Sequence, residues 1–152
     1  MSHLMKISEA ASLALHVMAF LAGRPLRMVT AKEAAARLRV SEAHLAKVLQ
    51  RLAKAGLVRS TRGQKGGFTL KKPAREIPLL EIYETIEGRL EETSCLVGVP
   101  ICLGEECVLG GLLKKVDDEA RAYLTRTRLS DLERVFGRDH RQGQSPALAA
   151  GS

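Results

Sequence analysis

Residues 30–70 read TAKEAAARLRVSEAHLAKVLQRLAKAGLVRSTRGQKGGFTL, and this stretch contains two helix starts followed by a hairpin pattern. Thr30 and Glu33 have the spacing of a capping box, which predicts a short helix through Leu38. Ser41 can cap a second helix over Glu42–Ala55. Two short helices joined by a tight connection are the pattern of a helix-turn-helix.

The second predicted helix has one apolar face and one polar face. Four aliphatic side chains recur at i, i+3, i+4 and i+7 and predict a buried stripe: Leu45, Val48, Leu49 and Leu52. Gly56 supplies the residue that ends the helix. The opposite face carries donors and small groups, with no carboxylate beyond Glu42: Ala43, Lys47, Gln50 and Lys54, flanked by His44 and Arg51. Such a face suits a polyanion.

A glycine-punctuated hairpin follows the second helix. Residues 57–61 and 68–70 have strand composition, and the basic turn Arg62–Gly67 joins them. Its glycines permit positive φ, and Arg62 and Lys65 place charge at the tip. The fold class is therefore predicted as mainly α with a small β-hairpin wing, a winged helix-turn-helix with a long dimerisation helix after it.

DNA binding is the interpretation on which the helix, the hairpin and the charge agree. Helix-turn-helix pairs also occur as plain packing units, and many basic faces are only solvated. The predicted DNA contacts are Ser41, Ala43, His44, Lys47 and Arg51 from the helix, and Arg59, Thr61, Arg62, Gln64 and Lys65 from the wing.

Charge is divided unevenly along the 152 residues, whose net charge is +7. Residues 24–75 hold 14 lysine and arginine residues against 2 acids, whereas residues 76–119 hold 3 against 11. The basic half should therefore meet a polyanion. An anionic membrane is less favoured, because the basic unit has no exposed apolar face. No signal peptide or membrane span is recognised, and a cytoplasmic protein is expected.

Helices are also predicted on both sides of residues 30–70. Residues 2–4 resemble a cloning remnant, with Met5 as the natural start. Residues 7–21 are apolar almost all round, and Glu9, Ser12 and His16 could share one face. The ordinary interpretation of His16 is a hydrogen-bonded histidine at the edge of the core. Pro78 fits the first position of a helix over Leu79–Glu87, which completes a DNA-binding domain of residues 5–92.

The remaining chain divides into a loop, a long helix and a tail. Residues 93–107 form a cysteine-bearing loop, and residues 108–140 are predicted as a dimerisation helix with a short helix begun by Ser130. Apolar side chains keep helical spacing for about five turns: Leu109, Leu112, Leu113, Val116, Ala120, Tyr123 and Leu124. Since this stripe has no other obvious cover, the same helix of a second chain is its expected partner, in a homodimer. Residues 141–152 are predicted to be a disordered tail.

All three cysteines, Cys95, Cys102 and Cys107, fall within 13 residues. An odd number in a cytosolic chain disfavours a disulfide framework. Intervals of six and four residues, with no histidine in the loop, fit one zinc ion poorly. Two interpretations stay open: an iron–sulfur cluster wrapped by thiolates, and a redox-active thiol loop without metal. An electron carrier or thiol oxidoreductase would use the same cysteines but would not need the basic helix and wing.

The run LAKVLQRLAKAGL (45–57), continued by VRSTRGQKGGFTL (58–70), resembles the Rrf2 family of winged-helix regulators, the group of IscR, NsrR, RirA and CymR. The resemblance covers residue 5 to about residue 132. It implies a homodimeric transcription factor, often a repressor, that senses iron–sulfur status, nitric oxide, redox state or, through a partner, cysteine metabolism. It also implies that Cys95, Cys102 and Cys107 hold a [2Fe-2S] or [4Fe-4S] cluster and that Arg62 enters the minor groove.

The chain departs from the family pattern at several positions. Cluster-binding members commonly have five residues between successive cysteines. Ala46 stands where IscR-like members carry a glutamate that discriminates between operators. Gly110 stands at the IscR-like histidine ligand and Ser12 at the NsrR-like aspartate ligand. The expected fourth ligand is His16 of the partner subunit, which matches a histidine ligand in the family; the alternatives are a carboxylate (Glu9, Glu105 or Glu106) or an exogenous small ligand.

Overall fold

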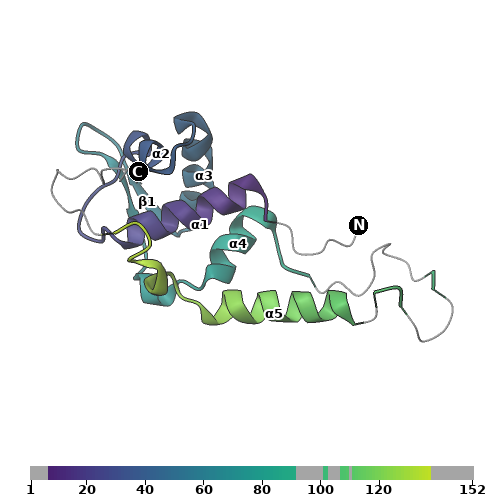
Figure 1. The fold of residues 1–152 in the computed structure, drawn as a ribbon. Coiled ribbons are helices and arrows are strands. Elements are labelled where there is room, and N and C mark those ends of the chain that lie inside the picture. Colours follow the sequence, from purple (N-terminus) through teal and green to yellow (C-terminus); the bar gives the residue numbers. More distant parts are fainter. Residues whose placement is uncertain (1–6, 92–100, 103–106, 110, 138–152) are drawn as a thin grey trace, which may run out of the picture.

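A single helix, α1, contacts most of the other elements of the computed structural model, which describes residues 7–91, 101–102, 107–109 and 111–137. Figure 1 shows α1 crossing the middle of the molecule, with the helix-turn-helix on one side and α4 and α5 on the other. In chain order the elements are α1 (Glu9–Ala22), α2 (Ala31–Leu38), α3 (Glu42–Lys54), β1 (Val58–Thr61), β2 (Gly67–Leu70), η1 (Ala74–Glu76), α4 (Leu79–Glu87), α5 (Leu112–Arg126) and η2 (Leu129–Leu132).

The apolar sequence of α1 is buried as predicted, with Val17, Met18 and Phe20 at most 2% exposed. The helix begins two residues later than expected. Ser8 is its N-cap, because the Ser8 hydroxyl accepts a hydrogen bond from the amide of Ala11 at 3.1 Å. Ile7 therefore lies outside the helix and is 55% exposed.

The predicted helix-turn-helix is confirmed as α2 and α3. The hydroxyls of Thr30 and Ser41 cap the two helices as expected. The capping box at Thr30 is only half formed, since the side chain of Glu33 pairs with Arg27, whose Nη1 lies 3.0 Å from Oε2 of Glu33. The predicted stripe of α3 is buried, and Gly56, at φ 78°, follows the end of the helix. The stripe fixes which face of α3 remains outside.

The wing is an antiparallel pair of β1 and β2 that is joined to the start of the helix-turn-helix. Val58 pairs with Leu70 and Thr61 with Gly67. Val29 adds a bridge to Phe68, with both backbone hydrogen bonds formed at 3.0 and 2.8 Å. A Cβ on Gly67 would lie 2.7 Å from the carbonyl oxygen of Val29, so glycine permits this close approach.

Helix α4 has the predicted bounds and packs against α1. Pro78 was predicted as its first helical residue, but it is the N-cap, with an extended ψ of 147°. Gly88 ends the helix at φ 84°. The buried side chains of α4 are Leu79, Ile82, Tyr83 and Ile86.

The long helix α5 differs most from the prediction. It begins at Leu112, with Gly111 as N-cap, so Leu109 lies in a turn before it. Leu113 and Leu124 are 2% and 5% exposed within the single chain, and they are therefore already covered. The predicted stripe is therefore only partly available to a second chain, because its buried edge is covered within the chain while Leu112 and Tyr123 on its other edge are 51% and 49% exposed.

The last short helix is present as the 3-10 turn η2, but it begins at Leu129 with Arg128 as its N-cap, one residue before the predicted start at Ser130. The backbone of Thr127 and Leu129 bonds to that of Leu79 and Ile77 at 3.0 and 2.8 Å, which joins this end of the chain to α4. Among the described residues no helix is long and apolar enough to cross a membrane. The predictions for residues 2–5, 93–100 and the tail 141–152 fall outside the described residues, and so do those for Cys95, Glu105, Glu106 and Gly110.

Candidate functional sites: a nucleic-acid interface and a cysteine segment

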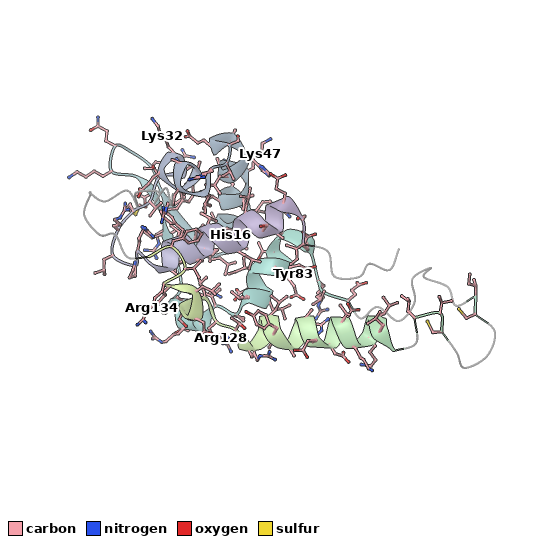
Figure 2. The ribbon with its side chains drawn as sticks, in the orientation of Figure 1. His16, Lys32, Lys47, Tyr83, Arg128 and Arg134 are labelled. Carbon is pink, nitrogen blue, oxygen red and sulfur yellow. The ribbon has the colours of Figure 1, made fainter. Side chains whose placement is uncertain are left out.

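The outward face of α3 carries small and donor side chains, as the sequence predicts. Ser41, Ala43, Lys47 and Gln50 are exposed, whereas the buried stripe consists of Leu45, Val48, Leu49 and Leu52. Figure 2 shows Lys47 projecting from the body on the same side as Lys32 of α2. Lys32 is not among the contacts predicted from the sequence. The only sequence feature that could have indicated it is the dense positive charge of residues 24–75.

Two of the predicted contacts on α3 have partners inside the chain. Nδ1 of His44 lies 3.6 Å from Oε1 of Glu9, at the start of α1. Nη2 of Arg51 donates to the carbonyl oxygen of Ile86, in the last turn of α4, at 2.7 Å. These interactions direct part of each side chain toward the body. Local sequence patterns do not reveal either interaction, because the partners lie 35 residues apart in both pairs.

The predicted contacts on the wing are all exposed: Arg59, Thr61, Arg62, Gln64 and Lys65. The turn between the strands is closed by a hydrogen bond from the amide of Gly66 to the carbonyl of Gly63 at 3.0 Å. Gly66 is required there, since a Cβ would collide with the carbonyl oxygen of Thr61. The folded turn therefore holds Arg62 and Lys65 at the outer end of the hairpin.

The cysteine segment, residues 93–107, is described by the structure only at residues 101, 102 and 107. Cys102 and Cys107 are free thiols and exposed. Within the described ranges, no three histidine, cysteine or acidic side chains lie close enough together to hold a metal ion. Exposed thiols outside a packed core have the chemistry of a metal-binding or redox segment and differ from ordinary buried cysteine.

His16 is exposed on α1, and the hydrogen bond that it makes fixes its tautomer. Nδ1 lies 2.6 Å from the carbonyl oxygen of Ser12, which can only accept, so Nδ1 carries the proton. Nε2 of the neutral ring then holds the lone pair that a metal would need. The ring of Phe136 stands edge-on to it, with centroids 6.2 Å apart. Figure 2 shows His16 midway along α1.

One buried titratable group lies between α4 and the helices around it. Burial raises the pKa of Tyr83, and the negative charges of Glu87, Asp117 and Glu84 raise it further. Asp117 of α5 is itself 5% exposed. The contact between α4 and α5 is therefore partly polar.

Comparison with known proteins agrees with this arrangement. Residues 7–134 match the family described as "Rrf2: Iron-dependent Transcriptional regulator". The chain is 34% identical over 118 residues to YwgB of Bacillus subtilis (strain 168), named as an HTH-type transcriptional regulator, with 76% of each chain covered. It is 28% identical to IscR of Cronobacter sakazakii over 116 residues, with 72% of each chain covered.

Two solved structures have the same fold. CymR, the global cysteine regulator of B. subtilis, superposes with a TM-score of 0.72 at 28% identity, covering 85% of this chain and 96% of CymR. IscR of T. potens superposes with a TM-score of 0.67 at 27% identity, covering 84% and 85% of the two chains.

Proposed function

The chain belongs to the Rrf2 family of transcriptional regulators, and from this membership we propose that it is a cytoplasmic, homodimeric repressor whose operator affinity depends on an iron–sulfur cluster. Its relatives regulate transcription and are not enzymes, so the electron carrier and the thiol oxidoreductase lose their support. The double-stranded operator and the cluster are considered in turn.

Operator binding rests on one observation: the exposed face of α3 and the exposed wing carry the cationic and small side chains that nucleic-acid recognition uses. Ser41, Ala43 and Lys47 would enter the major groove with α3, and Arg62 would contact the minor groove beside it. Arg59, Thr61, Gln64 and Lys65 would bind the backbone around the wing, and Lys32 a phosphate next to α3. His44 and Arg51 would contribute through the donors that their internal partners leave available.

The cluster would be held by Cys95, Cys102 and Cys107, with His16 of the partner subunit as the fourth ligand. The exposure of Cys102 and Cys107 and the available Nε2 of His16 support this donor set. Such a cluster would supply a redox-active group whose oxidation, nitrosylation or loss would change the charge of the cysteine segment. Cluster nuclearity, [2Fe-2S] or [4Fe-4S], follows from neither the spacing nor the donors.

A second candidate is a regulator of the same fold that responds through its thiols or a partner protein without a cluster. The likeness to CymR, a cysteine regulator, favours it, and so do the unequal intervals between the cysteines.

The two candidates are separated by one experiment in two stages. Protein reconstituted with iron and sulfide under anaerobic conditions is used to select duplexes from a randomised pool, and iron and labile sulfide are measured on the same sample. Failure to enrich any duplex would refute the DNA-binding function. Enrichment together with the absence of bound iron and sulfide would refute the cluster and leave the thiol-responsive regulator.

A further inference from the structure

The chain leaves α4 through a short junction, residues 86–90, that precedes the cysteine segment. Gly88 ends the helix, and Leu90 folds back so that its side chain is 9% exposed. Figure 1 shows this teal segment running from the N-terminal end of α1 toward α5. The amide of Leu90 donates to Oε1 of Glu84 at 2.9 Å, which fixes the junction to α4 itself.

The helix that faces the DNA holds the start of this junction. Nη2 of Arg51, in the last turn of α3, donates to the carbonyl oxygen of Ile86 at 2.7 Å. That carbonyl belongs to the last turn of α4, where helical carbonyls lack partners and favour a nearby cation. Arg51 of α3 therefore caps the C-terminal end of α4, and a shift of either helix along the other would break a charged hydrogen bond.

The helix that follows the cysteine segment holds the end of the junction. The guanidinium of Arg121, on α5, donates from Nη2 to the carbonyl oxygen of Leu90. Both backbone polar groups of Leu90 are thus bound by side chains, one from α4 and one from α5. A buried or half-buried backbone group that loses its partner is costly, so these contacts constrain the junction.

The cysteine segment is consequently connected at both ends to the same set of hydrogen bonds. It begins at residue 93, three residues after Leu90, and it ends at Cys107, five residues before α5, whose Arg121 returns to Leu90. From this closed arrangement we infer that Arg51 and Arg121 are positioning residues that couple the state of the cysteine segment to the orientation of α3. The inference rests on the proposed function and assigns Arg51 a role in addition to the DNA contact predicted from its position.

The test measures coupling as a ratio of two operator affinities. Dimers of the parent, Arg51→Ala and Arg121→Ala proteins are titrated against the selected duplex, before and after their thiols are alkylated with iodoacetamide. Alkylation perturbs the cysteine segment whether or not metal is bound. We expect alkylation to change the operator affinity of the parent protein. In both variants the ratio of the affinities before and after alkylation should be closer to one by roughly 2- to 30-fold, the range measured for residues along coupled networks.

Lys47→Ala is the matched control, because it removes one positive charge from the same helix without touching the junction. It should weaken both forms equally and leave the ratio unchanged. Arg51→Lys, which keeps the charge and can still donate one hydrogen bond, should restore part of the coupling. Arg121 lies on α5, on the other side of α4 from α3 (Figure 1), so a simple loss of DNA contacts predicts no effect of Arg121→Ala.

Two results would overturn the inference. In the first, Arg51→Ala weakens operator binding equally before and after alkylation, so the ratio of the two affinities stays at the parent value. The slope of log affinity against log salt concentration then also falls by about one unit, as expected for the loss of one phosphate contact. In the second, alkylation leaves the affinity of the parent unchanged, so that the junction transmits nothing while DNA binding itself stands. Failure to select any duplex would refute both the proposed function and the inference, and this outcome differs from the two results above, in which a duplex is bound. Should Arg51→Ala fail to fold, the Arg121→Ala ratio decides.

Discussion

The imidazole of His44 and the carboxylate of Glu9 lie 3.6 Å apart, from Nδ1 to Oε1, so α3 is in contact with the first turn of α1. His16, two turns further along α1, instead donates from Nδ1 to the carbonyl of Ser12. The two histidines therefore lie on different surfaces and have different partners, and substituting them should affect different properties.

His16→Ala is expected to lower cluster content while leaving the fold intact, because the ring is exposed and its hydrogen bond is local. Loss of a group that only supports a ligand already costs roughly 10- to 100-fold in metal affinity, so loss of a ligand should cost at least as much. Iron, labile sulfide and the visible spectrum are measured after anaerobic reconstitution. His44→Ala is the matched histidine control and should bind the parent amount of iron; equal iron in both variants would remove His16 from the ligand set.

Arg62→Ala should weaken operator binding by about 1–3 kcal/mol, since the arginine is exposed beside the turn of the wing. Lys65→Ala, which removes a proposed phosphate contact, should instead reduce the salt slope by about one unit. Fluorescence anisotropy at several salt concentrations measures both. Arg128→Ala removes the same charge from the opposite side of the molecule (Figure 2) and should have little effect. Affinity losses equal to that of Arg128→Ala would contradict a specific role for the wing.

Val116→Asp should dissociate the proposed homodimer. Leu112 and Tyr123 are 51% and 49% exposed, and Val116 lies on the same side of α5, half-buried, so these three form the apolar face still available to a partner. A charge placed there should cost about 2 kcal/mol or more of association free energy. Sedimentation at micromolar concentration reports the monomer.

Lys115→Asp, at an exposed neighbouring position, controls for added negative charge and should remain dimeric. Leu113→Asp is a poor test of the interface, because Leu113 is buried within its own chain and its replacement should unfold the protein. A dimeric Val116→Asp protein would place the interface elsewhere.

Stability should fall at alkaline pH through Tyr83. Its pKa is raised by burial and by neighbouring carboxylates, so above pH 10 the unfolded chain loses this proton before the folded one does. The stability contribution is complete below the unfolded pKa of 10.0 and is lost as pH rises through the folded value, with a slope of at most about 1.4 kcal/mol per pH unit.

Urea unfolding of the parent and Tyr83→Phe between pH 8 and 11 measures this loss. The phenylalanine variant should show a shallower decline above pH 10, whatever its stability at pH 8, and Tyr123→Phe, whose ring is 49% exposed, should follow the parent. Parallel declines in all three proteins would assign the alkaline transition to other groups.

Features determined by short-range sequence pattern were predictable. Thr30 and Ser41 cap their helices, and Gly56 follows α3 at positive φ, because each depends on backbone groups within a few residues. Even here Glu33 departed from its expected role, since Arg27 offered a charged partner that a single-helix pattern does not include.

Contacts between distant segments were not predictable from the same patterns. Helical spacing grouped Leu113 with Leu112 and Val116, but only the position of α5 in the fold distinguishes the covered side from the exposed side. Likewise, the charge of Arg51 and its position on the helix are those of a DNA contact. Its hydrogen bond to the carbonyl of Ile86 could not be predicted, because it depends on how α3 and α4 cross. The ligand set of the cysteine segment remains a prediction for the same reason, because it depends on a second chain.

The bridge between Val29 and Phe68 fastens the wing to the residue just before the α2 cap, with two hydrogen bonds and no room for a side chain at Gly67. The wing and α3 therefore approach a duplex as one rigid body, with a separation that the protein sets in advance. A duplex must match that separation in the width and depth of its adjacent grooves, and sequences that are stiff or easily compressed differ in what this match costs. Selectivity would then extend to base pairs that no side chain touches, through the shape of the DNA.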